Sequence, residues 1–482
     1  MKKSMDSLKL FRFLLLAAGI SVMGLVVPEV RGGVVFTNLI SFTGNSGAYP
    51  GANPYAGLVL GPDGNFYGVA PNGGTNGNGI IFEISADGGF FTNIYSFSGG
   101  TNGANPVGAL ILGADGNFYG TTYNGGVSNW GTIFQFSTNG TLATLGMLGG
   151  TNGAHPDTAL IQAPDGSLYG ATKYGGPYNK TTSGGTGYGV IFQLTTNGSL
   201  LTPVIFDSTN GANAAALVPG HDGNFYGTTE WGGSIGQVSL GFGTIFRLNP
   251  DGTFTNLYKF SGNNDGGFPV AGLVQGNDGN FYGTTSVGGT RQIGTVFVLG
   301  PGGQFQASYS FPSSSVGGYP YSSLVQGMDG NLYGTTAIGG ANQLGAIFQI
   351  TTSGNLTSLI SFTGTSGSSP GANPQGPLVQ GPDGNFYGVT PSGGANGLGT
   401  IFRLSVPMPA VFKTITLTNG TAVLTWNAVA GQTYQVQYAN DLTPINWTNL
   451  TKLGPVPNGT MTTIDLDAAG SPQRFYRVVL YP

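Results

Sequence analysis

Ionisable side chains suited to acid–base chemistry are few in this chain. Beyond residue 32 it holds two glutamates and two histidines: Glu83, Glu230, His155 and His221. It has no cysteine, which excludes thiolate catalysis, disulfides and cysteine-based metal sites. Hydrolysis of a glycosidic bond needs two carboxyl groups roughly 5 to 9.5 Å apart. Glu230 with Asp207 or Asp157 is the pairing that we consider for such chemistry.

A second set of candidates is aromatic and polar, and it surrounds Glu230 in the sequence. Its members lie between residues 123 and 242 and form our predicted ligand-binding set: Tyr123, Trp130, His155, Lys173, Tyr174, Tyr178, Tyr188, Glu230, Trp231 and Phe242. Aromatic rings can stack on sugar faces or hold a peptide while polar groups take hydroxyls. In this hypothesis Trp231, Tyr174 and Trp130 are anchors, whereas Glu230, Lys173 and His155 orient the ligand. The alternative is that these loops fold over their own aromatic residues, with His155 a simple loop substitution.

A repeat must position these residues. The hexapeptide Asp-Gly-Asn-Phe-Tyr-Gly begins at Asp63, which marks repeat one. It recurs with small changes in six further copies, which mark repeats two to seven: Asp115, Asp165, Asp222, Asp278, Asp329 and Asp383. The spacings are 52, 50, 57, 56, 51 and 54 residues. This period is typical of a four-stranded propeller blade. An Asp-Gly pair favours a tight hairpin between the first two strands, and the Phe and Tyr that follow are expected to pack between blades.

Each repeat contains four strand-like segments. A short apolar run precedes the hexapeptide, and Gly-Thr-Ile-Phe or a variant follows it, for example at Gly243. An alternating segment such as 254–260 completes the set. One such fourth segment, residues 35–42, precedes all other elements, and none follows the last Gly399-Thr400-Ile401-Phe402. We therefore predict an all-β, seven-bladed β-propeller over residues 33–406, in which the N-terminal strand closes the last blade.

The repeat also carries a family resemblance. The run Leu-Val-Gln-Gly-x-Asp-Gly-Asn-Phe-Tyr-Gly-Thr-Thr, then Gly-Gly and Gly-Thr-Ile-Phe, resembles that of bacterial secreted choice-of-anchor tandem-repeat (GloVer-type) proteins. The resemblance implies a shared repeat with C-termini that attach to the cell in different ways. It brings no activity and no catalytic residues. This chain departs from members with a sorting anchor, because it ends without an apolar tail and a basic cluster.

The N-terminal residues indicate export. Lys2, Lys3, Lys9 and Arg12 accompany an apolar run over residues 13–27, so residues 1–32 read as a signal peptide; a retained N-terminal anchor is the alternative. Its removal takes away five of 15 basic and two of 19 acidic residues, which leaves a net charge of −7. Such a surface is ill suited to phosphate backbones, so we exclude nucleic acid as a partner. No other stretch is apolar enough to span a bilayer. We expect a secreted or cell-envelope protein and a monomer.

The last residues form a separate module. After Pro407 the glycine density falls, and segments such as 423–426, 434–438 and 475–478 alternate like half-buried strands. They predict a small β-sandwich over residues 407–482 that resembles a fibronectin type III module. We expect Trp426 to lie in its core, and Trp447 too, with a ligand platform as the alternative for Trp447.

The sequence thus favours a secreted, non-catalytic binding or scaffold protein, whose ligand is a polysaccharide or cell-surface protein at the loops of blades two to four. A glycan-cleaving enzyme that uses Glu230 and a structural envelope component are the alternatives. We assign no catalytic residue, metal site or cofactor. The seven hexapeptide aspartates each stand without the neighbouring oxygen ligands that calcium needs.

Overall fold

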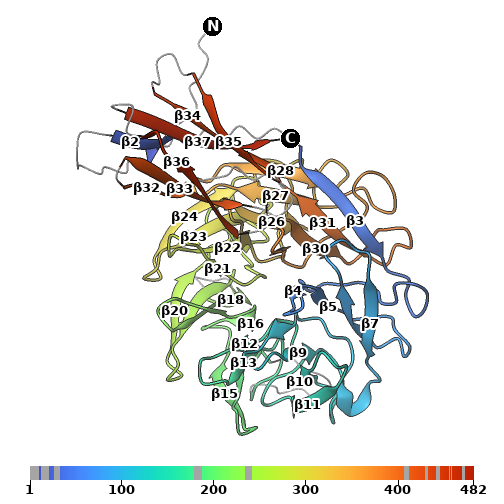
Figure 1. The fold of residues 1–482 in the computed structure, drawn as a ribbon. Helices are drawn as coiled ribbons and strands as arrows, with labels where there is room; N and C mark the ends of the chain where they lie inside the picture. The colour runs from blue at the N-terminus through green and yellow to red at the C-terminus, as the bar shows by residue number, and fades with distance from the viewer. Residues whose placement is uncertain are drawn as a thin grey trace. The chain divides into compact units, whose positions relative to one another are not determined.

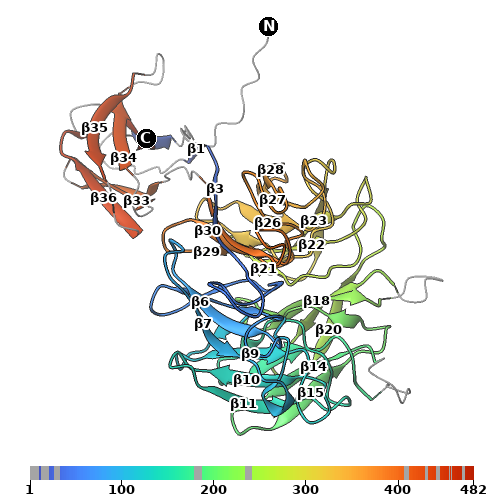
Figure 2. The same ribbon diagram turned by 90° about the vertical axis from the view of Figure 1, so that its right-hand side faces the viewer.

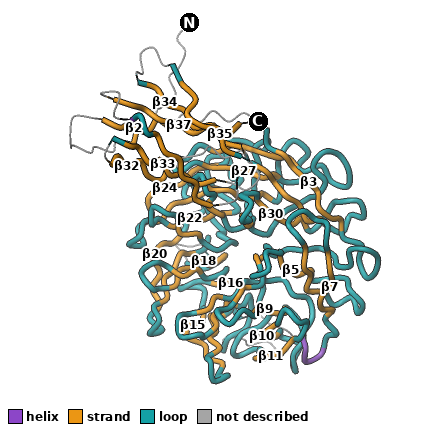
Figure 3. Tube along the Cα trace, in the orientation of Figure 1, coloured by secondary structure: helices purple, strands orange, loops and turns teal. Residues whose placement is uncertain are grey.

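The fold is given by a computed structural model, which describes residues 10–11, 21–25, 33–177, 187–233, 241–406 and, with short gaps, 412–481. In these residues strands and loops alternate, and helical structure is limited to short 3₁₀ turns such as η1 (Gly100–Asn102) (Figure 3). No helix in the described part of the chain is long and apolar enough to cross a membrane. The protein is therefore all-β in the residues that the structure describes.

The described residues fall into two compact regions, each described by itself below. The larger, here the repeat region, contains Phe36–Val379 and Phe386–Arg403. The smaller, here the C-terminal region, contains the described residues of 1–35, 380–385 and 404–482.

The repeats supply strands of four kinds, which follow one another in chain order (Figures 1 and 2). The first strands are short: β4 (Val59–Leu60), β8 (Ile111–Leu112), β12 (Ile161–Gln162), β17 (Val218–Pro219), β21 (Val274–Gln275), β25 (Val325–Gln326) and β29 (Val379–Gln380). The second strands begin in the hexapeptides: β5 (Phe66–Ala70), β9 (Phe118–Thr122), β13 (Leu168–Ala171), β18 (Phe225–Trp231), β22 (Phe281–Thr285), β26 (Leu332–Thr336) and β30 (Phe386–Thr390).

The third strands hold the Gly-Thr-Ile-Phe segments: β6 (Ile80–Ile84), β10 (Thr132–Phe136), β14 (Val190–Leu194), β19 (Thr244–Leu248), β23 (Thr295–Leu299), β27 (Ala346–Ile350) and β31 (Thr400–Ser405). The fourth strands are β7 (Phe91–Ser96), β11 (Leu142–Met147), β15 (Leu200–Ile205), β20 (Phe254–Lys259), β24 (Phe305–Ser310), β28 (Leu356–Ser361) and β3 (Val35–Ser41). Each set of four forms one sheet, with the order β4-β5-β6-β7 as the example, and repeat four adds β16 (Ala212–Ala214).

The hexapeptide forms the hairpin between first and second strands, as predicted. In repeat one, Asp63 Oδ1 accepts a hydrogen bond from the Asn65 backbone N–H at 3.1 Å, and Asp63 Oδ2 accepts one from the Tyr67 hydroxyl at 2.9 Å. The final glycine is required because Gly68 lies opposite Phe82 on β6, and a Cβ atom there would collide with the Phe82 ring. The aspartates thus hold the hairpin.

The Phe and Tyr of the hexapeptide pack between neighbouring sheets, which confirms that prediction. The tyrosine of one repeat meets the phenylalanine of the next with ring centroids 4.2–4.9 Å apart, in the pairs Tyr67–Phe118, Tyr169–Phe225, Tyr226–Phe281, Tyr333–Phe386 and Tyr387–Phe66. Where a repeat has leucine instead, Leu168 and Leu332 share buried clusters with Tyr119 and Tyr282. The sheets therefore share their hydrophobic cores in pairs.

The first and last repeats are in contact. Strand β3 belongs to the sheet β29-β30-β31-β3, although in the sequence it lies at the opposite end of the repeat region from the other three strands (Figure 1). The Phe42 N–H donates to the Gly399 carbonyl at 3.0 Å, and Asn396 Nδ2 donates to the Phe42 carbonyl at 2.8 Å. One buried cluster joins Phe42 and Phe66 to Tyr387.

The C-terminal region contains two sheets. One has the order β32 (Phe412–Thr418), β33 (Thr421–Ala428) and β36 (Gly459–Asp465). The other contains β35 (Thr448–Leu453), β34 (Thr433–Ala439) and β37 (Gln473–Tyr481), to which β2 (Ser21–Leu25) adds in parallel and β1 (Leu10–Phe11) beyond it. Most of the predicted signal peptide lies outside the described residues, so that prediction stays open.

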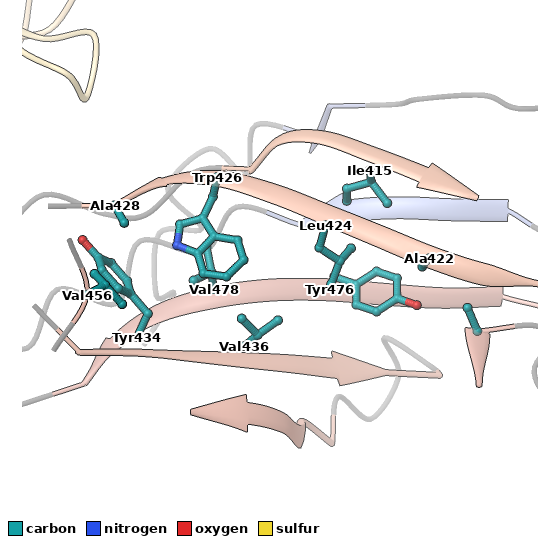
Figure 4. Close-up of a cluster of buried hydrophobic side chains, with 11 residues drawn as sticks. Ile415, Ala422, Leu424, Trp426, Ala428, Tyr434, Val436, Val456, Tyr476 and Val478 are labelled. Atoms are coloured by element: carbon teal, nitrogen blue, oxygen red, sulfur yellow. The ribbon is translucent and has the colours of Figure 1, made fainter. Parts of the chain in front are cut away.

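Side chains from both sheets meet in one core. Trp426 is fully buried, as predicted, and packs with Tyr434, Val436 and Val478 (Figure 4). Trp447 is half-buried instead, and the Arg477 guanidinium lies 4.5 Å from the centre of its ring. The prediction of a core position for Trp447 is therefore wrong, because its side chain is half-buried and does not belong to the buried cluster around Trp426.

A buried ion pair lies in the same region. Arg474 Nη1 is 2.6 Å from Asp465 Oδ2, and 8% and 2% of the two side chains are exposed. The same oxygen accepts a hydrogen bond from the Tyr476 hydroxyl at 2.7 Å. Burial of a charge is tolerated only when it is paired in this way.

Candidate functional site

A small polar pocket opens where repeats three, four and five meet. Its volume is about 80 Å³, room for a few water-sized groups. Three ionisable residues line it, Asp157, Lys173 and Glu230. The rest of the lining is small or apolar: Thr158, Asn213, Ala214, Ala215 and Val270. Three of the few charged side chains in this glycine-rich chain therefore share one pocket.

Each ionisable residue is positioned by a strand or a turn next to one. Asp157 follows Pro156 in the turn that leads into β12, and Lys173 comes two residues after the end of β13. Both side chains are about one third exposed, at 31% and 33%.

Glu230 lies on a strand extension found in repeat four. There Ala214 replaces the proline of the Gly-Ala-Asn-Pro motif, and β16 pairs with β18 through Ala212↔Trp231 and Ala214↔Thr229. Proline lacks a backbone N–H and is disfavoured inside a sheet, so its loss permits this pairing. Glu230 therefore stands on regular backbone rather than on a loop.

The charges in the pocket influence one another. Lys173 Nζ lies 3.7 Å from Asp157 Oδ2. Burial raises the pKa of Asp157, Lys173 lowers it and Glu230 raises it, with a net rise. Burial lowers the pKa of Lys173, but the charges of Asp157, Tyr174 and Glu230 outweigh that and leave it raised. Lys173 is therefore a cation at neutral pH, next to a carboxyl that takes up a proton more readily than a free aspartate.

Four of the predicted ligand-binding residues form one aromatic cluster around His155. The Tyr123 ring stacks on it at 4.5 Å between centroids, and Trp130 and Tyr174 approach it edge-on at 5.3 and 6.2 Å. His155 Nδ1 is 2.9 Å from the Tyr123 carbonyl oxygen. All four side chains are half-buried. They cover one another in part, as the alternative predicts, and leave part of their surface free.

A second cluster contains Trp231 and Phe242. Phe268 packs between them, at 4.3 Å from the Trp231 ring and 5.4 Å from the Phe242 ring. Phe242 and Tyr188 are half-buried and also rest on the hydrophobic cores of the sheets. Tyr178 lies outside the described residues. The predicted set is thus divided between the pocket, two aromatic clusters and core-facing positions.

The structure distinguishes the two carboxyl pairings that we considered for hydrolysis, Glu230 with Asp157 and Glu230 with Asp207. Asp157 and Glu230 line the same pocket, whereas Asp207 closes a turn and is not part of the lining. Asp207 Oδ1 accepts hydrogen bonds from the backbone N–H groups of Thr209 and Asn210, both at 3.0 Å. Burial raises the pKa of Asp207, but these hydrogen bonds lower it below the usual value. His221 is exposed in its hairpin turn.

The predicted ligand-binding set missed several residues. Asp157 and Val270 line the pocket but are not members of the predicted set. Phe268, also absent from the set, contacts two of its aromatic members, Trp231 and Phe242. A signal for Phe268 exists in the sequence, because it occupies a position that is asparagine in four other repeats. Within the described residues, no cluster of three or more histidine, aspartate or glutamate side chains could hold a metal ion.

Several solved structures are similar to this chain at low identity. A gluconolactonase from Xanthomonas campestris is 11% identical with a TM-score of 0.39, over 68% of this chain and 90% of that chain. A Bacteroides fragilis protein assigned as a 6-phosphogluconolactonase is 17% identical with a TM-score of 0.43, over 83% and 98%. A Dyadobacter fermentans protein of unknown function is 11% identical with a TM-score of 0.38, over 78% and 99%. At these values the similarity says nothing about activity.

No curated protein matches the sequence. The profile of the Gloeobacter/Verrucomicrobia repeat matches residues 18–182 and 178–372, which is more than half of the chain. This result agrees with the repeat resemblance drawn from the hexapeptides. The chain belongs to the Gloeobacter/Verrucomicrobia repeat family.

Proposed function

We propose that this protein is an exported, non-catalytic binding protein whose ligand is a glycan, held at the pocket of Asp157, Lys173 and Glu230. The repeat region serves as its scaffold, a seven-bladed propeller closed by β3. The hydrogen bonds of Phe42 to the last repeat and the shared core of Phe66 and Tyr387 support closure. The basic and apolar residues before position 33 support export.

The observation that carries the proposal is the convergence of one cation and two carboxyl groups in a pocket of otherwise small residues. Sugar hydroxyls both donate and accept hydrogen bonds, so a lysine ammonium and carboxylates can satisfy them together. The half-buried rings of Tyr174 and Trp231, each next in sequence to a pocket residue, offer apolar surface for a sugar face. Neutral hydroxyl-rich ligands suit this mixed charge better than phosphates do.

The test is a screen of the exported protein against polysaccharides and oligosaccharides, followed by calorimetric titration of the ligand that binds. Lys173→Met removes the cation and keeps the aliphatic stem. A hydrogen bond to a charged group contributes roughly 1.5–3 kcal/mol, so the Kd should rise about 10- to 100-fold. Lys259→Met, at an exposed lysine on β20, is the control and should leave the Kd unchanged. A protein that binds no glycan, or binds it equally well as Lys173→Met, would rule this function out.

A second candidate function, glycan cleavage, rests on one specific observation. Asp157 and Glu230 line the same pocket, and glycosidases use a pair of carboxyl groups on either side of the bond that they cut. In that case the bound glycan would be cut, and both Asp157→Asn and Glu230→Gln would abolish product. An intact glycan after prolonged incubation with the wild-type protein would exclude cleavage. A purely structural envelope component predicts no glycan binding at all.

A further inference from the structure

One backbone position recurs before the first strand of every repeat, and it is strained in some repeats. Its φ lies between 53° and 56° in all seven: Asn53, Asn105, His155, Asn213, Phe268, Tyr319 and Asn373. This left-handed conformation is unfavourable for residues with a Cβ atom and is best tolerated by glycine and asparagine. Four repeats use asparagine. Phe268 and Tyr319 are bulky residues in a conformation that such residues rarely adopt.

Three of the four asparagines also make a side-chain hydrogen bond to the neighbouring repeat. Asn105 Nδ2 donates to the Pro71 carbonyl at 2.8 Å, and Asn53 and Asn373 make the same contact to the preceding repeat at 2.8 and 2.9 Å. The His155 ring nitrogen keeps an equivalent contact, to the Tyr123 carbonyl. A phenylalanine side chain has no hydrogen-bond donor that could replace it. Phe268 packs against Trp231 and Phe242 instead, so its strained backbone conformation is accompanied by ring contacts beside the pocket.

Phe268 lies beside the pocket, and Tyr319 and Tyr321 lie in the next repeat. Phe268 contacts Trp231, which follows Glu230, and Val270, two residues later, lines the pocket. Tyr321 occupies in repeat six the position that Val270 has in repeat five, and its side chain is 38% exposed. The Thr284 hydroxyl on β22 of repeat five donates to the Ser322 carbonyl at 3.2 Å, so the segment of repeat six that carries Tyr321 packs against repeat five. Tyr319 and Tyr321 therefore belong to the repeat that adjoins Phe268 and Val270.

We propose that Phe268, Tyr319 and Tyr321 form a second subsite, which stacks on the sugar ring next to the one held in the pocket. The proposal rests on the glycan-binding function above and specifies the ligand as an oligosaccharide. The pocket of about 80 Å³ takes a few hydroxyl-sized groups, so the rest of a longer ligand lies outside it. Aromatic rings provide the flat apolar surface that a second sugar ring needs.

Tyr319→Asn separates a ligand role from a structural one. The substitution restores the asparagine of repeats one, two, four and seven, relieves the strained conformation and provides an amide that can reach the preceding repeat. If Tyr319 serves the ligand, the Tm is unchanged or higher while affinity for the oligosaccharide falls about 3- to 10-fold, the value of a lost aromatic contact. Affinity for the corresponding monosaccharide stays the same. If Tyr319 is structural, the Tm falls.

Tyr321→Ala has a matched control in Tyr55→Ala, because both tyrosines follow the proline of the same motif in different repeats. Only Tyr321→Ala should weaken binding of the oligosaccharide. Wild-type affinity in both Tyr319→Asn and Tyr321→Ala, or a joint fall of Tm and affinity in Tyr319→Asn, would overturn the subsite. If Lys173→Met weakens binding and these variants do not, the subsite alone fails. If the wild-type protein binds no glycan, subsite and proposed function fail together.

Discussion

Glu83 lies at a hairpin, whereas Glu230 lines the candidate pocket. The substitution Glu83→Gln tests the structural role of the first of these glutamates. Glu83 lies on β6 beside the first hexapeptide hairpin, where its Oε1 accepts a hydrogen bond from Asn65 Nδ2 at 2.6 Å. Burial raises the pKa of Glu83; the Asn65 hydrogen bond lowers it, and the nearby charge of Asp63 raises it further. In repeats two, three and six a glutamine stands at this position. Gln135 Nε2 donates to Asp115 Oδ2 at 3.1 Å and to the Tyr119 hydroxyl at 2.9 Å.

Glu83→Gln should therefore stabilise the repeat region. The glutamine removes a like-charge contact with Asp63 and supplies a donor to it, while its oxygen still accepts from Asn65. One such hydrogen bond at a partly exposed site contributes about 1 kcal/mol. With an unfolding entropy of about 2.1 cal/mol/K per residue, this raises the Tm of a region of this length by about 1 °C.

The stabilisation should depend on pH. A carboxyl whose pKa is raised by folding contributes stability that is present below its unfolded pKa and is lost as the pH rises through its folded pKa. The wild-type protein therefore loses this contribution above the ordinary glutamate range of about 4.3, whereas the glutamine variant does not. Calorimetric scans should show the difference in Tm between variant and wild type growing from about pH 4 to about pH 7. A lower Tm for Glu83→Gln at neutral pH, or a difference that stays flat with pH, would refute this reasoning.

Two further predictions concern the frame. Asn53→Ala loses the hydrogen bond to the Pro391 carbonyl and puts alanine, which tolerates the left-handed conformation less well than asparagine, at a φ of 56°, so the free energy of unfolding should fall by about 2 kcal/mol. Asn53→Gly loses the hydrogen bond alone and should cost about half as much in urea titrations; equal losses would contradict the conformational argument. Asp465→Ala leaves Arg474 buried without its partner and should destabilise the C-terminal region by about 3 kcal/mol, measured by calorimetry. Asp467→Ala, at an exposed neighbour, should be nearly neutral, and a similar cost at both positions would count against the buried pair.

Local features of the fold were predictable because the hexapeptide encodes them locally. An Asp-Gly pair needs a turn, and the alternation of Phe66 and Tyr67 places the two rings on opposite sides of β5. Seven copies then repeat the same contacts between sheets. Residues 35–42 precede all other segments, whereas the last repeat lacks a fourth segment, so the last repeat was the expected partner of residues 35–42. In the structure β3 is hydrogen-bonded to the sheet of that repeat.

The site was only partly predictable because it depends on residues that approach one another from three repeats. Glu230 and Lys173 were singled out by their loops, and Asp157 was one of two candidate carboxyl partners of Glu230, but nothing in the sequence decided between Asp157 and Asp207. Trp447 was misjudged for a similar reason, since Arg477 comes from a different strand. Phe268 and Tyr319 could have been found by alignment of the repeats, as bulky residues where asparagine prevails.

The most direct test of the glycan-binding claim compares the two glutamates by calorimetric titration with the oligosaccharide that binds best. Glu230→Gln and Glu83→Gln make the same chemical change, one inside the pocket and the other at a hairpin. The proposed site predicts that Glu230→Gln raises the Kd about 10-fold or more, whereas Glu83→Gln binds like the wild-type protein. Equal affinity of the two variants would contradict the assignment of the ligand to this pocket.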